Sequence, residues 1–443
     1  QGQSPQMLSR RAGKSISAGR FRHPASGDTC ASMHGAGTGK SVSEGFRKSI
    51  YEEGNGGCDH AWIIRALRKK SYVACGRWYY SHPMNKSTPK VFAGIGVALV
   101  AVLAFLLLSS KAPRVVDATP MRASMQMSAW TLANSFQRPR RALAAVAVNG
   151  YLYVLGGIND NDDYVKEVEY ARINPDGTLG AWHTTAALIE GRFYLAAVGT
   201  DDYLYALGGA TGPRGNDNQP IASVERARIN ADGSLEPWQL HNYLTTPRRG
   251  LKTVKYNNQV YAIGGYNGVF LKSVERATLQ SDGSLGEWQL EKEASTIDRY
   301  IHSAAIFNNH IYLLGGHVRS AQKISYGDVE MTSIQADGSL LPWRIEISTL
   351  QIPRFIAAAF TMNKQVYMLG GHDGQYRLDS MERAPIDTQG HVGDWSFAAK
   401  LKVARSAAAV AVHGNTAYVL GGMEEGALNS VGMAGHARDI YQR

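Results

Sequence analysis

A unit of about fifty residues occurs six times in this 443-residue chain, and no other feature restricts the possible folds as strongly. Gly-Gly doublets begin at intervals of 51 to 56 residues. A tyrosine lies three residues before each doublet, an arginine lies sixteen residues before it, and a tryptophan recurs at nearly the same spacing. Since four features each occur six times, the pattern predicts six similar supersecondary units that pack against one another.

Most of these repeated residues are expected to be structural. Tyrosine and tryptophan fill space between packed sheets, and glycine suits places where two backbones approach too closely for a Cβ atom. The expected structural residues are Gly156, Gly157, Gly208, Gly209, Gly264, Gly265, Gly315, Gly316, Gly370, Gly371, Gly421 and Gly422, with Tyr153, Tyr205, Tyr261, Tyr312, Tyr367 and Tyr418, and with Trp130, Trp182, Trp238, Trp288, Trp343 and Trp395.

Each repeat has the same order of strand and turn signals. A small apolar run follows the arginine, and after a turn with Asn or Gly comes a strand of the form YLYVLGG. A polar loop leads to a third strand such as SVERARI, and an Asp-Gly turn leads to a fourth strand that carries the tryptophan. Short strands joined by such turns predict antiparallel four-stranded sheets. Six such sheets predict an all-β, six-bladed propeller over residues 127–434.

The two ends of the repeat region complement each other. The last doublet is followed by one more strand, residues 429–434, and by no tryptophan strand. The missing type of strand occurs at the other end, where residues 127–132 contain Trp130. We therefore expect the N-terminal strand to complete the last blade, which closes the ring and protects its edge. Residues 435–443 are expected to form a C-terminal tail.

The formal charge of +10 belongs to the N-terminal segment and not to the repeats. Residues 1–90 hold 15 Lys and Arg against 5 Asp and Glu, and the remainder is balanced. All three cysteines also lie in this segment. Its low-complexity, Gly- and Ser-rich character predicts a disordered basic segment, and Met84 is a candidate for the true start of translation. Because the body is neutral, no nucleic-acid partner is expected.

A run of 18 uncharged residues, 91–108, separates the basic segment from the body. A helix of this length matches the hydrocarbon core of a bilayer, so the run predicts a transmembrane or signal-anchor helix. Residues 109–126 would be a linker. The more basic leader favours the cytoplasmic side, with the propeller on the outer side, periplasmic or extracellular. Cleavage after Ala118 and secretion is the alternative.

The Tyr-x-x-Gly-Gly strand, the downstream tryptophan and the preceding arginine resemble the kelch repeat family, over residues 127–434. The usual tyrosine of the third strand is present only once, as Tyr170. The Asp-Gly turn resembles bacterial kelch proteins, which implies a bacterial protein of a membrane-anchored or exported type. The resemblance implies a six-bladed propeller that acts as a binding or scaffold module.

The six arginines are the candidate ligand-binding residues. Each precedes the innermost strand, so all six are expected to circle the channel mouth on one face, where guanidinium groups bind carboxylate or phosphate. In kelch adaptors, arginines at this position help to bind acidic peptides. In the alternative, each arginine is structural, packs against its neighbouring blade and pairs with an acidic residue. The repeated glutamate of the third strand is expected to pair with an arginine or to cap a turn. His302 is expected to be a surface residue of the same face. The arginines are Arg140, Arg192, Arg248, Arg299, Arg354 and Arg405.

These observations predict a membrane-tethered propeller that binds a protein, such as a membrane-complex subunit, or an anionic glycan or peptide. They favour a non-catalytic module and leave catalysis open. The alternative is a carbohydrate-active isomerase resembling the six-bladed sialic-acid mutarotases, with Glu190 as its carboxylate. No cofactor or metal is expected, because the acidic loop 159–163 lacks the spacing of an EF-hand.

Overall fold

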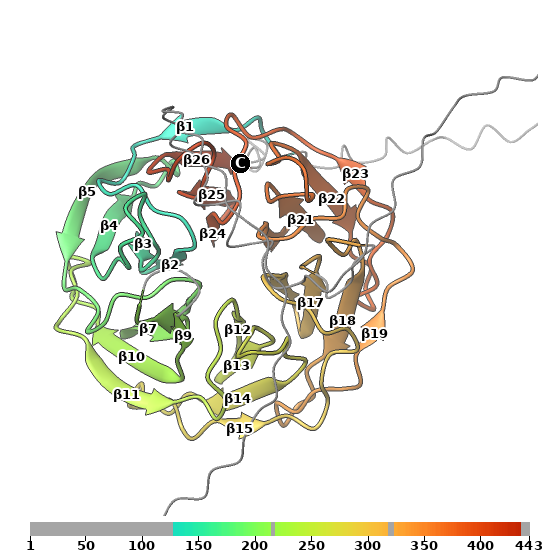
Figure 1. Cartoon of the computed structure of the whole chain (residues 1–443), viewed down its shortest axis with the longest axis horizontal. Coiled ribbons are helices and arrows are strands. Elements are labelled where there is room, and N and C mark those ends of the chain that lie inside the picture. The colour runs from blue at the N-terminus through green and yellow to red at the C-terminus, as the bar shows by residue number, and fades with distance from the viewer. Residues whose placement is uncertain (1–126, 214–217, 318–322, 436–443) are drawn as a thin grey trace, which may run out of the picture. The chain divides into compact units, whose positions relative to one another are not determined.

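The computed structural model describes residues 127–213, 218–317 and 323–435. Six four-stranded antiparallel sheets surround a central axis, as Figure 1 shows, which confirms the predicted all-β six-bladed propeller. The predictions for the basic segment, the apolar run 91–108, the linker and the tail from residue 436 lie outside the described residues. Across the ranges that are described, no helix has the length and hydrophobicity needed to span a bilayer.

The strands follow the predicted order in every blade, from the axis outward. Blade 1 contains β2 (Ala144–Val148), β3 (Tyr151–Leu155), β4 (Val168–Ile173) and β5 (Leu179–Thr185); blade 2 contains β6 (Ala196–Gly199), β7 (Tyr203–Leu207), β10 (Ser223–Arg228) and β11 (Gln239–Tyr243); blade 3 contains β12 (Lys252–Tyr256), β13 (Gln259–Ile263), β14 (Val274–Thr278) and β15 (Gln289–Leu290). Blade 4 contains β16 (Ser303–Phe307), β17 (His310–Leu314), β18 (Val329–Ser333) and β19 (Arg344–Ile345); blade 5 contains β20 (Ala358–Met362), β21 (Gln365–Leu369), β22 (Met381–Pro385) and β23 (Ser396–Phe397). A small hairpin, β8 (Ala210–Thr211) and β9 (Gln219–Pro220), extends the loop of blade 2.

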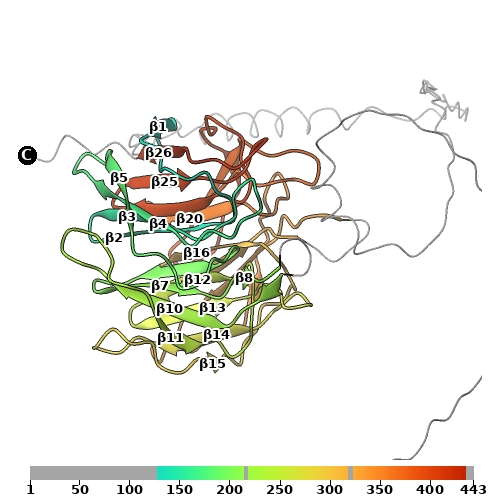
Figure 2. The same cartoon turned by 60° about the vertical axis from the view of Figure 1, so that its left-hand side comes forward.

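Blade 6 is built from both ends of the described chain. It contains β24 (Ala409–His413), β25 (Thr416–Leu420) and β26 (Val431–Gly435), with β1 (Thr131–Ala133) as its outer strand. Thr131 faces Met433 and Ala133 faces Val431 in the antiparallel register. Figure 1 and Figure 2 show β1 beside β26, along the outside of the same sheet. The predicted closure of the ring by the N-terminal strand is confirmed, with β1 shorter than the expected 127–132.

The repeated aromatic residues fill the spaces between blades, as expected. The six tyrosines of the second strands are fully buried, and the tryptophans are at least 93% buried. Several of these tyrosines also join neighbouring blades through a hydrogen bond. The hydroxyl of Tyr153 in blade 1 donates to the carbonyl of Gly233 in blade 2 at 2.7 Å, and that of Tyr418 in blade 6 donates to Gly177 in blade 1 at 2.6 Å.

A ring of backbone hydrogen bonds surrounds the axis. The residue two places after each repeat arginine has a left-handed backbone, with φ between 44° and 64°. The N–H group of such a residue donates to the carbonyl of its counterpart in the preceding blade, and five of these bonds measure 2.8–3.0 Å. These residues, which we call the axial ring, are Ala142, Tyr194, Gly250, Ile301, Ile356 and Ala407.

The Gly-Gly doublets lie where blades approach closely, as predicted. In the first doublet both glycines have positive φ, and a Cβ atom on Gly156 would lie 2.8 Å from the carbonyl oxygen of Arg192 in the next blade. A larger residue there would push neighbouring blades apart.

Candidate functional site

The six repeat arginines are buried and do not form an exposed ring of guanidinium groups. Their exposed fractions are 0–2%. The expectation that they line the channel mouth as ligand-binding residues therefore differs from the structure, which favours the structural alternative. The physical reason is that each side chain folds back into its own blade and finds its partners there.

Each guanidinium group is held by backbone carbonyls and, in five blades, by a carboxylate. Arg248 donates to the carbonyl of Gly264 at 2.9 Å and to that of Ser273 at 3.1 Å. Its Nη2 donates to Glu275 at 2.5 Å. The other four ion pairs, which we group with this one as the blade clamps, are Arg140–Glu169, Arg192–Glu225, Arg299–Glu330 and Arg354–Glu382. The predicted pairing of the repeated glutamates with arginine is confirmed.

The glutamate of a clamp also holds the segment that enters the blade from its neighbour. Glu169 accepts the backbone N–H groups of Gln137 and Arg138, at 2.6 and 3.2 Å. Glu382 accepts those of Gln351 and Ile352, at 2.6 and 3.1 Å. A buried carboxylate is tolerated when charge and hydrogen bonds satisfy its oxygens. Burial lowers the pKa of each arginine in these pairs, and the glutamate opposes that shift.

Blade 6 has the arginine of a clamp without its glutamate. Gly432 occupies the register position of the glutamate, opposite Val419. Arg405 donates to the carbonyl of Gly421 at 2.9 Å and to Ser430 Oγ at 3.0 Å, and no ion pair of Arg405 occurs among the described residues. Burial lowers its pKa to about 10, with Glu424 opposing the shift from a distance.

His302 is buried and not a surface residue as expected. It is fully enclosed, and within the described residues neither ring nitrogen makes a hydrogen bond of ordinary geometry. Burial lowers its pKa well below the usual value, and the charges of Arg299 and Lys252 act in the same direction. The imidazole is therefore neutral at physiological pH.

Glu190 lies on an exposed loop, where its carboxylate accepts a hydrogen bond from Thr211 Oγ1 at 3.0 Å. Within residues 127–213, 218–317 and 323–435, no cluster of three or more His, Cys, Asp and Glu side chains is arranged to hold a metal ion. The isomerase alternative, which depends on Glu190, stays a prediction.

The residues that sequence reasoning missed surround the axis on one face. The residue directly after each repeat arginine forms a β-bridge with the residue directly after each Gly-Gly doublet. These twelve residues, with the loops between the second and third strands, make up what we call the loop face. In blades 2 to 5 they include the aromatic and imidazole rings of Phe193, Tyr266, Tyr300, His317, Phe355 and His372.

The rings of the loop face form a continuous series of contacts that is completed by Tyr194 of the axial ring and by Phe270 of the blade 3 loop. Phe193 stacks on Tyr164 with ring centroids 5.0 Å apart, and Tyr266 lies 5.3 Å from Tyr300. His317 and Phe355 lie 5.4 Å apart, as do Phe355 and His372. Phe193 and Phe355 are buried, whereas Tyr266, Tyr300, His317 and His372 are half-buried. The face therefore presents partly exposed rings with apolar faces and polar edges, which suit binding to proteins and sugars.

Both cationic and apolar side chains border this series. The guanidinium group of Arg249 lies 4.8 Å from the ring centre of Tyr266 and also hydrogen-bonds Asn218. The loop tips carry Val269, Ile324 and Tyr376, which are 50%, 45% and 61% exposed. Exposed apolar side chains that lie together around an aromatic surface are typical of an interaction site.

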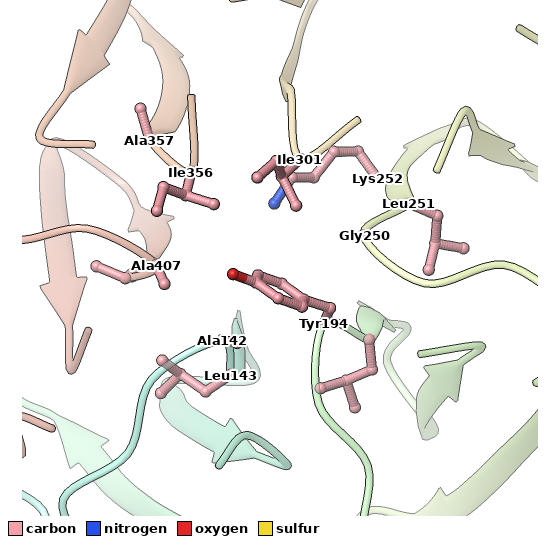
Figure 3. A pocket seen from close by; sticks show the side chains of 12 residues that line it. Ala142, Leu143, Tyr194, Gly250, Leu251, Lys252, Ile301, Ile356, Ala357 and Ala407 are labelled. Atoms are coloured by element: carbon pink, nitrogen blue, oxygen red, sulfur yellow. The ribbon is translucent and has the colours of Figure 1, made fainter. Parts of the chain in front are cut away.

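A cavity of about 30 Å³ lies on the axis at the level of the axial ring. Figure 3 shows the hydroxyl of Tyr194 and the amine of Lys252 pointing into the middle of it, with Ile301, Ile356 and Ala407 around them. Burial raises the pKa of Tyr194 and lowers that of Lys252 to about 8. Among the described residues that line the cavity, Lys252 alone has a charged side chain.

Comparison with known proteins supports the kelch interpretation. Residues 139–170 and 247–276 match the family described as Kelch motif. Beta-scruin of Limulus polyphemus is 24% identical over 268 residues, which are 58% of this chain and 28% of beta-scruin. Kelch-like protein 35 of Homo sapiens is 33% identical over 129 residues, which are 29% of this chain and 19% of that protein. The chain thus spans less than a third of the length of either relative.

Among solved structures, that of YjhT has a TM-score of 0.55 and 14% sequence identity, and the match covers 70% of this chain and 98% of YjhT. Such a likeness shows the fold alone. The motifs, the relatives and the six blades together support a kelch-repeat six-bladed propeller.

The clamps predict that equivalent arginines differ in their effect on stability. Replacing Arg354 with Leu leaves the buried Glu382 without its cation, so we expect the free energy of unfolding to fall by about 3–5 kcal/mol. Arg405→Leu strands no carboxylate and should cost about 1–2 kcal/mol. Urea unfolding of the two variants measures both values. Equal losses would contradict the clamp role of Glu382.

His302 predicts a dependence of stability on pH. Its pKa in the folded state is depressed, so protonation favours the unfolded state. The stability it contributes is present above about pH 6.5 and is lost as the pH falls below that value, with a slope of at most about 1.4 kcal/mol per pH unit. His302→Leu, which copies the leucine of blades 1 to 3, should flatten this slope. Unfolding between pH 5 and 7.5 tests it, with the exposed His413→Gln as the control; an unchanged slope in His302→Leu would refute the prediction.

Proposed function

We propose that this protein is a membrane-tethered binding module whose loop face holds a partner protein. The kelch-propeller fold suggests a protein-binding or scaffold module. We choose the loop face as the binding surface because it has the aromatic series, with the exposed apolar loop tips around it.

A second apolar surface runs around the outer rim, and it serves as a comparison. Five of the six outer strands expose an apolar residue two places after the tryptophan, namely Leu132, Leu240, Leu290, Ile345 and Phe397. These positions repeat from blade to blade, so the rim presents nearly the same apolar side chain on each of these five blades. The loop face differs from blade to blade, which favours recognition of one specific partner.

The tether is proposed from the sequence. Residues 91–108 are uncharged and long enough to cross a bilayer, and the basic residues before them favour a cytoplasmic leader. The propeller would then face the outer side, within reach of the extracellular part of a membrane complex. An anionic glycan or peptide is a second kind of partner for the same face.

The test captures membrane proteins with the full-length chain. Val269→Asp combined with Tyr376→Asp places charge on the loop face, and we expect it to lower recovery of the specific partner at least tenfold. Leu290→Asp combined with Ile345→Asp is the matched control on the rim and should leave recovery unchanged. If the rim variant loses the partner while the loop-face variant keeps it, the proposed surface is wrong.

A second arm of the same experiment tests the tether. The wild-type chain should stay in the membrane fraction after extraction at alkaline pH. Leu99→Arg combined with Leu103→Arg adds about 5–7 kcal/mol to the cost of insertion, because each central arginine costs about 2.5–3.5 kcal/mol. This variant should move to the soluble fraction. A chain that is soluble without these changes would contradict the tether.

A further inference from the structure

Three repeat positions around the axis are occupied differently in neighbouring blades. The axial ring holds Tyr194 in blade 2, where the other blades have Ala, Gly or Ile. The next position holds His302 in blade 4, where the others have Leu or Ala. The position after that begins the innermost strand and holds Lys252 in blade 3. Packing in a repeat fold is met by similar apolar residues in each copy, so polar or charged residues that depart from the pattern are candidates for function.

Lys252 departs most strongly from its repeat position. Its equivalents in the other blades, fixed by the register of the first and second strands, are Ala144, Ala196, Ser303, Ala358 and Ala409. A small residue therefore suffices for the packing of this strand. Lys252 instead extends an amine into the axial cavity, as Figure 3 shows.

The charge of Lys252 has no acidic counterpart around the cavity. None of the described residues that line it is Asp or Glu, and no ion pair of Lys252 occurs in the described part of the chain. The repeat glutamates of blades 3 and 4 are already engaged by Arg248 and Arg299. The neighbouring His302 is kept neutral, so it adds no second positive charge beside Lys252. An unpaired, half-buried cation among apolar side chains is stabilised by an anion that reaches it.

The size of the cavity and its hydrogen-bond donors limit which class of anion could bind there. The cavity of about 30 Å³ has room for about two water molecules, since each needs about 10–15 Å³. A carboxylate group, with two oxygens in one plane, matches this space better than a tetrahedral phosphate. Tyr194 offers a hydroxyl donor into the same space (Figure 3). The amine supplies a positive charge for a carboxylate, and the phenol hydroxyl supplies a directional hydrogen-bond donor.

We propose that the axial cavity binds a carboxylate group, with Lys252 Nζ as its charge partner and the Tyr194 hydroxyl as a second donor. The carboxylate comes either from a small free acid or from an Asp or Glu side chain of the bound partner. In the second form the inference rests on the proposed function, because the partner must then cover the loop face.

The first arm of the test uses the full-length protein and acetate as the probe. Binding of ¹³C-labelled acetate is followed by its NMR line width, with acetamide as the uncharged probe of similar shape. We expect saturable broadening with acetate and none with acetamide. Lys252→Ala, which copies the residue of four other blades, should weaken acetate binding at least tenfold. Lys255→Ala on the same strand, where the side chain is exposed, is the matched control and should bind as the wild type does.

The second arm measures recovery of the membrane partner with the same variants. A loss with Lys252→Ala but not with Lys255→Ala assigns the carboxylate to the partner. Loss of acetate binding alone assigns the site to small acids, and this result stands even if the loop-face variant leaves partner capture unchanged. If Lys252→Ala, folded as judged by its thermal transition, leaves both acetate binding and partner recovery unchanged, the proposal is overturned.

Discussion

The rest of the structure depends on the buried pair of a repeat arginine and a third-strand glutamate. The pair joins three parts of a blade: the start of the innermost strand, the carbonyl of the Gly-Gly doublet and the segment that arrives from the preceding blade. A single four-stranded sheet has two apolar faces and is not stable alone. The clamps fix where blades 1 to 5 begin relative to their neighbours, and in blade 6 Arg405 makes the contacts to Gly421 and Ser430 without a glutamate. The six sheets can then bury their faces against one another.

This use of the arginines changes where function is to be sought. Residues that repeat in every blade are occupied with packing, capping and pairing, as the clamps and the buried tyrosines show. Their side chains are no longer free to bind a ligand. The residues that vary from blade to blade lie around the axis and on the loop face, where Phe193, Tyr300 and Lys252 have no role that the repeat requires. We therefore expect specific recognition to depend on the residues that depart from the repeat pattern.

The sequence predicted the architecture closely, because every blade repeats the same signals and six copies average out local ambiguity. The closure of blade 6 followed from a missing strand at one end and a surplus strand at the other. The role of the arginines was undecided for a physical reason: a residue before an innermost strand can point out of the mouth or back into its own blade, and spacing does not determine the direction. The glutamate two residues into the third strand was the signal for the second choice.

The loop face was missed because a search for repeated residues discards it. Tyr300 and Phe355 each follow a repeat arginine, but the residue at that position is Arg, Phe, Arg, Tyr, Phe and Ser in blades 1 to 6. Only the ring closure brings these side chains together. Lys252 appeared as one more charged residue in a strand, and its departure from alanine became meaningful once the register aligned the innermost strands.

The most direct test of the clamp account is a double-mutant cycle on Arg354 and Glu382 in urea unfolding. The account predicts that the variant with both residues replaced by Met loses less stability than the sum of the two single variants, by about 1–3 kcal/mol, because neither charge is then left buried alone. Additive losses would contradict it, since they would mean that the two side chains stabilise the blade independently and that the arginine is free for another role.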